Sequence, residues 1–270
     1  MDFIVLLKYI VLGLVQGFTE PIPVSSSGHI FIINELFLNM DDVGLTFAIL
    51  TNTASLLAIL IIFREDIIRL LTNSFGYIST GKKRYKSDFK FSLFVIIGSI
   101  PAGILGVLFS DVIDEYLTSM TTIAITLFLT GVALWLIRNL RGVKRDGDLT
   151  YKDALVVGFA QAIALIPGIS RSGATVISSI AVGMKQETAL RFSFMLYIPV
   201  SLGGVILGIS DFINEPPTSD LYVPYIAAFI VTFFVTYFAM KWFIGIMKHG
   251  KLQYFAYYCF AMSIFLFFYF

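Results

Sequence analysis

Residues 17–29 read GFTEPIPVSSSGH, a stretch with one carboxylate, two prolines, three consecutive serines and a histidine. The chain around it is strongly apolar: 57% of its 270 residues are hydrophobic and 14% are charged. Soluble domains carry far more charge, so this composition predicts an integral membrane protein. A polar segment broken by prolines inside such a chain predicts a point where membrane helices are interrupted.

Charged residues set the predicted orientation in the membrane. Lys and Arg concentrate in residues 64–90, 138–152 and 241–251, whereas residues 110–119 and 210–220 contain acids and no base. By the positive-inside rule, the three basic loops lie in the cytoplasm and the two acidic loops lie outside. The net charge of +1 gives no sign of a nucleic-acid partner.

Six apolar segments are each long enough to cross about 30 Å of hydrocarbon. They are residues 43–63, 91–110, 119–137, 192–209, 221–240 and 252–270. The two regions left over, 1–40 and 153–187, each begin and end on one side of the membrane and contain two short apolar arms around a break. We therefore expect an all-α polytopic membrane protein, a single domain over 1–270, with six full transmembrane helices and two re-entrant helical hairpins.

A weak internal duplication relates the two halves of the chain, about 1–140 and 150–270, because a shift of 145 residues superposes the hairpins without a gap. The matched pairs are Gly13 with Gly158, Gln16 with Gln161, Ser25 with Ser170, Ser27 with Ser172 and Gly28 with Gly173. One hairpin enters from outside and the other from the cytoplasm, so the halves have inverted topology. We expect their broken tips to meet in a polar cavity near the bilayer midplane.

The two tips carry the polar side chains of the predicted site. The first tip contributes Gln16 and Glu20, on one helix face, followed by Ser25, Ser26, Ser27 and His29, and the second contributes Gly168, Ser170, Arg171, Ser172 and Thr175. An arginine at bilayer depth costs at least about 2.5 kcal/mol on insertion scales, so Arg171 is expected to have an anionic partner. Carboxylate, hydroxyls, imidazole and guanidinium beside two helix amino termini predict phosphate chemistry.

Other interpretations of these residues stay open. Glu20 and Arg171 would pair merely to join the two repeats, each serine would cap a helix, and His29 would be structural. Inverted repeats with broken helices are also typical of secondary transporters, so a carrier or flippase for an anionic lipid or solute is the alternative function. Phosphate release by the purified protein would separate the two functions.

The segments QGFTEPIPVSSSGH (16–29) and PGISRSGAT (167–175) resemble the two signature motifs of the bacterial undecaprenyl-diphosphatases, the bacitracin-resistance type of membrane phosphatase. The resemblance covers essentially the whole chain. It implies an enzyme of the bacterial plasma membrane that removes the terminal phosphate of undecaprenyl diphosphate and so recycles the lipid carrier for cell-wall synthesis. It also implies a divalent cation, Mg²⁺ or Ca²⁺, and an active site open to the external side.

Matched by motif position, Glu20, Ser26, His29 and Arg171 correspond to the family's essential residues. Gln16 stands where many members have Glu, which leaves Glu20 as the one expected metal ligand. In chemical terms Arg171 would grip the phosphates and Ser26 would be the nucleophile, activated by His29 or Glu20, with direct attack by water as the competing mechanism. The residues expected to bind the substrate are Gln16, Ser25, Ser27, Gly168, Ser170, Ser172 and Thr175. A polyprenyl diphosphate lipid and the bilayer are the expected partners, and a homodimer is compatible with the sequence.

Overall fold

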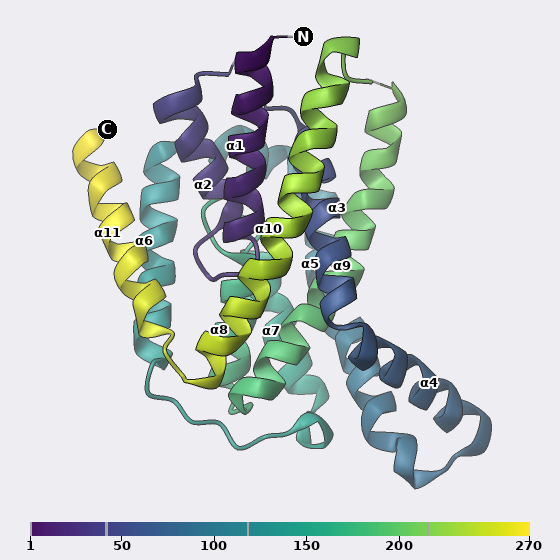
Figure 1. Ribbon diagram of the computed structural model, residues 1–270. Coiled ribbons are helices and arrows are strands. Elements are labelled where there is room, and N and C mark those ends of the chain that lie inside the picture. Colours follow the sequence, from purple (N-terminus) through teal and green to yellow (C-terminus); the bar gives the residue numbers. More distant parts are fainter. Residues whose placement is uncertain (1, 41–42, 118, 215) are drawn as a thin grey trace.

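The computed structural model of the chain describes residues 2–40, 43–117, 119–214 and 216–270, and for 110–117 and 210–211 it describes the backbone alone. Helices account for most of this part of the chain (Figure 1). Within it, five helices are long and apolar enough to cross a membrane. They are α3 (Leu45–Ile62), α5 (Lys86–Leu117), α6 (Met120–Ile137), α9 (Gln186–Asn214) and α10 (Tyr222–Lys248). The prediction of an all-α polytopic membrane protein is thereby confirmed.

The remaining predicted span, 252–270, forms α11 (Gln253–Tyr269), a shorter apolar helix of 17 residues. At 1.5 Å per residue it rises about 25 Å, slightly less than the thickness of the hydrocarbon core. Helices α5 and α9 extend beyond their predicted spans because the acidic stretches that follow begin without glycine or proline. Much of 110–119 and 210–220, predicted to be loops, is therefore helical, apart from residues 118 and 215, which lie outside the described residues.

Four short helices form two hairpins that enter the bundle from opposite ends (Figure 1). The first consists of α1 (Phe3–Thr19) and α2 (Ser26–Ile33), and α2 continues as the π-helix η1 (Asn34–Leu38). The second consists of α7 (Tyr151–Ile163) and α8 (Arg171–Ala181). The first hairpin enters from the end that holds the N-terminus and reverses direction inside the bundle. The second enters from the other end and also reverses inside the bundle.

The tips of the hairpins contact each other through hydrogen bonds. Ser172 Oγ donates to the carbonyl oxygens of Glu20 (3.1 Å) and Ile22 (3.2 Å), and Ser170 Oγ also donates to the Ile22 carbonyl, at 3.3 Å. These carbonyls lie in the irregular turn imposed by Pro21 and Pro23, where no helical N–H is available to them. Side chains of the second hairpin thus supply further donors to these carbonyls, beside the Val24 amide, which donates to the Ile22 carbonyl at 2.8 Å.

Each hairpin is seated against a long helix through a glycine. A Cβ added at Gly158 of α7 would lie 2.4 Å from the carbonyl oxygen of Gly98 in α5, so the two backbones are in direct contact. A Cβ added at its partner in the repeat, Gly13 of α1, would lie 2.8 Å from the Ala228 carbonyl oxygen in α10, where Thr232 Oγ1 also donates to the Gly13 carbonyl at 3.0 Å. Small residues at helix crossings allow this close packing in membranes.

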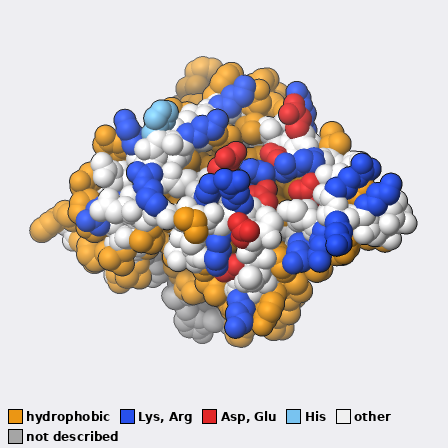
Figure 2. All heavy atoms as spheres, turned by 90° about the horizontal axis from the view of Figure 1, so that it is seen from below, with side chains coloured by type: hydrophobic (Ala, Val, Ile, Leu, Met, Phe, Trp, Pro, Cys, Tyr) orange, Lys and Arg blue, Asp and Glu red, His pale blue; other side chains and the backbone are white. Residues whose placement is uncertain are grey.

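The three basic loops gather at one end of the molecule, opposite the N-terminus (Figure 1). They contain α4 (Arg64–Thr80), η2 (Lys83–Tyr85) and η3 (Asp146–Asp148), and they join the spanning helices there. Figure 2 views this end and shows Lys and Arg interspersed with Asp and Glu. Arg191 is held among these acids, with Nη1 2.7 Å from Asp146 Oδ2. The charge asymmetry of the sequence therefore corresponds to a physical end of the fold.

Replacing Gly158 with Ala should destabilise the protein, because the new Cβ would overlap the Gly98 carbonyl. Overpacking of this kind costs about 1–3 kcal/mol, which should appear as a lower midpoint of thermal unfolding in detergent. Gly103→Ala in α5 is the matched control, since nothing lies within 4 Å of a Cβ there. Equal midpoints for the two variants would contradict the seating of α7 on α5.

The two ends of the fold should lie on opposite sides of the membrane. In a Cys259→Ser background, Ser219→Cys in the exposed turn η4 (Ser219–Leu221) should react with an impermeant thiol reagent in intact cells, and Ser79→Cys in α4 only after permeabilisation. Both native serines are exposed, so the labelling reports the side of the membrane rather than burial. Labelling of both cysteines from the same side would contradict the predicted topology.

Candidate active site

A cavity of about 500 Å³ lies where the tip of the first hairpin meets the start of α8. Its inner part is polar and is lined by Gln16, Glu20, Ser26, Ser27, Asn52 and Arg171. Its outer part, between α2 with η1 and α3, is mostly apolar and is lined by Ile30, Phe31, Asn34, Glu35, Met40, Val43 and Ala48. Because η1 leads back toward the N-terminal end of the molecule, the cavity extends in that direction from the tips.

The structure brings Gln16, Glu20 and Ser26 together at one carboxylate oxygen. Gln16 Nε2 donates to Glu20 Oε2 at 3.0 Å, and Ser26 Oγ donates to the same atom. Gln16 and Glu20 share a helix face, and the two prolines that end α1 turn the chain so that Ser26 returns to that face. Glu20 has 9% of its surface exposed, so it is a nearly buried carboxylate oriented by two neutral donors.

Two of the predicted substrate-binding serines cap helices instead of lining the cavity. Ser25 Oγ accepts a hydrogen bond from the Gly28 amide at 3.2 Å, and Ser170 Oγ accepts one from the Gly173 amide at 3.0 Å. Both are N-cap residues, and they occupy matching positions in the two hairpins. The capping interpretation therefore describes the observed contacts of this pair.

The other predicted residues of the second tip also make contacts within the protein. Ser172 bonds the first hairpin as described, and Thr175 Oγ1 donates to the carbonyl of Arg171 at 3.0 Å. Gly168 has a φ of +86°, and a Cβ there would lie 2.0 Å from Thr126 Oγ1, so only glycine fits this turn against α6. Among the predicted substrate-binding residues in the described part of the chain, Gln16 and Ser27 are the two that line the cavity.

Arg171 projects into the cavity as the first residue of α8 and is held by neutral groups. Its Nη1 donates to Ser201 Oγ at 3.1 Å, and its guanidinium carbon lies 5.4 Å from the centre of the Tyr197 ring. None of the ion pairs between described residues involves Arg171. The ion pair with Glu20 that would merely join the two repeats is therefore not among them. Its positive charge is thus available to an anion in the cavity.

Three polar side chains around Arg171 were not predicted from the sequence. Besides Ser201 and Tyr197, Asn52 of α3 lines the cavity and its Oδ1 accepts a hydrogen bond from Tyr197 Oη at 2.8 Å. Each belongs to an apolar spanning helix, and polar groups at membrane depth are functional candidates by default. That signal was present in the sequence.

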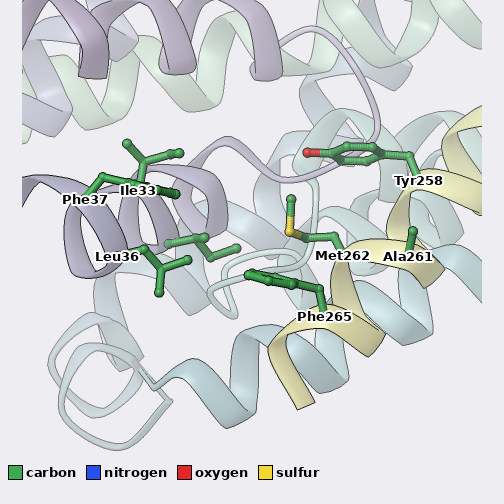
Figure 3. Close-up of a pocket in the computed structure, with 8 residues that line it drawn as sticks. Ile33, Leu36, Phe37, Tyr258, Ala261, Met262 and Phe265 are labelled. Carbon is green, nitrogen blue, oxygen red and sulfur yellow. The ribbon is translucent and has the colours of Figure 1, made fainter. Parts of the chain in front are cut away.

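His29 lies on the opposite face of α2 from the cavity. Its Nδ1 is 2.6 Å from the Ser25 carbonyl oxygen, and its Nε2 is 2.6 Å from Tyr258 Oη on α11. Tyr258 belongs to a separate apolar groove of about 330 Å³ between α2 with η1 and α11, into which Ile33, Leu36, Met262 and Phe265 project (Figure 3). The structure therefore does not bring His29 together with Glu20 and Arg171 in one cavity.

The cavity fits a hard divalent cation better than a transition metal. Its donors are carboxylate, hydroxyl and amide oxygens from Glu20, Ser26 and Asn52, the ligand type that Mg²⁺ and Ca²⁺ prefer. No group of three or more His, Cys, Asp or Glu side chains able to hold a metal occurs among the described residues. A cation here would take the rest of its ligands from water and from phosphate oxygens, as Mg²⁺ usually does.

The fold is that of a polytopic membrane protein, and one cavity holds the Glu20–Ser26 pair together with Arg171. This arrangement is the one expected of membrane proteins that bind anionic groups at broken helices. A comparison with protein families makes the assignment specific. The family described as bacitracin resistance protein BacA matches residues 9–265, and the chain belongs to this family. The resemblance carried by the two motifs is confirmed.

Several curated relatives are similar over nearly the whole chain. Undecaprenyl-diphosphatase 1 of Bacillus cereus is 55% identical over 263 residues, 97% of each chain. The undecaprenyl-diphosphatase of Oceanobacillus iheyensis is 54% identical over 265 residues, 97% of this chain and 96% of the relative. Undecaprenyl-diphosphatase 1 of Halalkalibacterium halodurans is 49% identical over 259 residues, 96% of this chain and 94% of the relative.

Arg171→Lys should weaken the binding of a diphosphate in the cavity, because a point charge cannot replace the planar fork of guanidinium donors. Loss of one charged hydrogen bond should raise the dissociation constant for methylenediphosphonate by about 10- to 150-fold. Calorimetry in detergent would measure this constant. Arg69→Lys, in an exposed ion pair with Asp66, is the matched control. An unchanged dissociation constant for Arg171→Lys would exclude a bidentate contact.

Proposed function

We propose that the protein is an undecaprenyl-diphosphatase, an integral membrane phosphatase that converts undecaprenyl diphosphate into undecaprenyl phosphate and inorganic phosphate. The observation that carries the proposal is the cavity in which Arg171, without an acidic partner, lies with the Glu20–Ser26 pair. The motifs and the three relatives named as undecaprenyl-diphosphatases point to the same activity. The names of the relatives correspond to the reaction that the motif resemblance implies. This reaction would return the lipid carrier to cell-wall synthesis.

Ser26 and Glu20 supply the attacking group and its base. Ser26 Oγ already donates to Glu20 Oε2, so the proton would pass to the carboxylate as Oγ attacks the terminal phosphorus. The bond from that phosphorus to the bridging oxygen breaks, undecaprenyl phosphate leaves, and water then hydrolyses the phosphoserine. The contacts of Ser26 favour Glu20 over His29 as the activating group, because His29 is turned toward α11. Direct attack by water is the competing route.

Arg171 would stabilise the charge of the reacting phosphates, and a divalent cation held at Glu20 would add to this stabilisation. The guanidinium would bind phosphate oxygens where Ser201 and Tyr197 hold it at present. A divalent cation, Mg²⁺ or Ca²⁺, would supply charge neutralisation for the diphosphate. Glu20 Oε1 is the expected ligand, since Oε2 is already shared by Gln16 and Ser26. Ser27 lines the same cavity and would donate a hydrogen bond to phosphate.

The proposed topology explains how a lipid substrate reaches the site. Residues 1–40 and 153–187 would be re-entrant hairpins of two inverted repeats, and α11 would complete six spans. The cavity extends away from the basic loops, so it would open to the external side of the bacterial plasma membrane. The apolar lining between α2 and α3, which includes Ile30, Phe31 and Val43, would guide the polyprenyl tail into the bilayer. The homodimer stays a prediction.

A transporter or flippase for an anionic lipid or solute is the second candidate. The observation that favours it is the pair of broken hairpins that enter from opposite ends and meet at their tips. Such a protein would bind diphosphate in the same cavity without releasing phosphate. The experiment that follows separates the two functions.

Purified protein in detergent should release phosphate from a C55 prenyl diphosphate, and a chelator should suppress the release. Ser26→Ala should lower kcat by more than about 150-fold, the upper limit for losing only a charged hydrogen bond. Ser178→Ala is the matched control, because that hydroxyl donates to the Ala174 carbonyl of its own helix. Binding of the lipid without phosphate release would favour the transporter.

The stereochemistry of the terminal phosphoryl group decides between the two routes. Transfer of a chiral phosphoryl group to water with net retention is expected, because a phosphoserine requires two displacements. Net inversion would exclude a single covalent intermediate and assign the attack to water.

A further inference from the structure

Both ring nitrogens of His29 are engaged, and their partners define the tautomer. Nδ1 lies 2.6 Å from the Ser25 carbonyl oxygen, which can only accept, so Nδ1 carries the proton. In the neutral ring Nε2 is then the acceptor, and Tyr258 Oη, 2.6 Å away, donates to it. The two rings also lie nearly parallel, 5.5 Å between centres at 17°. No lone pair of this imidazole is left for the proton of Ser26.

The group that His29 holds is the turn before the nucleophile. Ser25 has a φ of 70°, in the left-handed region that residues other than glycine rarely occupy. Its carbonyl accepts from His29 Nδ1 and, at 3.2 Å, from the His29 amide, while its Oγ accepts from the Gly28 amide. This turn directs Ser26 toward Glu20 instead of along the line of α1. A conformation of this kind persists only where its surroundings enforce it.

We infer that Tyr258 and His29 are positioning residues, joined in a hydrogen-bond chain from α11 through the Ser25 carbonyl to the turn that presents Ser26 to Glu20. The inference rests on the proposed function for the role of Ser26. It assigns to His29 the support of the nucleophile's backbone and not the removal of its proton. It also adds a residue of the last helix, Tyr258, to those on which the reaction depends.

The second contact of α11 with the same tip supports this assignment. Cys259 is fully buried, with Sγ 3.8 Å from the Pro23 carbonyl oxygen, next to Tyr258 in sequence. Helix α11 itself is fixed on α6, where Ser263 Oγ donates to the Ala124 carbonyl at 2.7 Å. The chain of hydrogen bonds therefore starts from an anchored helix and not from a free one.

The tautomer can be measured without any catalytic assay. The chain has two histidines, so His249→Gln, at an exposed position, leaves His29 as the one source of imidazole signals in protein labelled with ¹⁵N-histidine. The spectrum should show a neutral ring protonated at Nδ1, and Tyr258→Phe in the same background should shift the Nε2 signal. Tyr257→Phe, which alters a ring packed on Trp135, is the matched control and should leave it in place. A ring protonated at Nε2, or an Nε2 signal unchanged by Tyr258→Phe, would overturn the assignment even if the enzyme is active.

Kinetics separate positioning from proton transfer. Tyr258→Phe should lower kcat by about 10-fold with KM nearly unchanged, the effect of one lost hydrogen bond. His29→Asn retains an N–H donor near the place of Nδ1, so it should keep at least about 10-fold more activity than His29→Ala. If thermal unfolding shows that both variants are folded and kcat falls equally in His29→Asn and His29→Ala, His29 would act as a base and not as a positioning residue. If the unaltered protein releases no phosphate, the proposed function is contradicted, whereas the ¹⁵N spectrum still tests the His29 tautomer.

Discussion

Backbone polar groups that lie at membrane depth must find hydrogen-bond partners inside the protein, and this constraint organises the whole molecule. The turn around Pro21 and Pro23 takes the carbonyls of Glu20 and Ile22 out of the helical hydrogen-bond pattern. Hydroxyls of the second hairpin donate to both, beside the Val24 amide that donates to Ile22. These hydrogen bonds hold the two tips against each other. With the tips in contact, Arg171 at the start of α8 projects into the cavity that Glu20 also lines. The hydrogen bonds between the two interrupted helices therefore also bring the residues of the site together.

The fold and part of the site could be predicted because their causes are local. Long apolar runs gave five of the six expected spans as long helices, and proline and glycine marked both hairpin turns. Gln16, Glu20 and Ser26 converge for reasons visible in the sequence, namely helical spacing followed by two prolines. The ends of α5 and α9 were harder to place, because acidic residues stop a transmembrane span without stopping a helix.

The orientation of α2 could not be predicted, since it depends on a single residue in an unusual conformation. A positive φ is usually signalled by glycine or asparagine, and position 25 is a serine. Nevertheless, this angle decides that Ser26 faces the cavity and His29 faces α11. Tyr258 is separated from His29 by 229 positions, and no periodicity links them. Likewise, Ser170 and Ser172 are residue types that often bind phosphate, but their hydroxyls form hydrogen bonds with backbone groups of the two hairpins. Long-range partners, and not residue types, decided these outcomes.

Dependence on α11 also has a meaning for how the protein is made. A chain is synthesised from its N-terminus, so the first hairpin emerges from the ribosome well before the helix that carries Tyr258 and Cys259. During that interval His29, which donates to the Ser25 carbonyl, lacks the Tyr258 hydroxyl that donates to its Nε2. A nascent or truncated chain can therefore insert its two motifs into the membrane and still hold an unfinished site. The hydrogen-bond chain behind Ser26 is complete only once α11 has packed against the first hairpin.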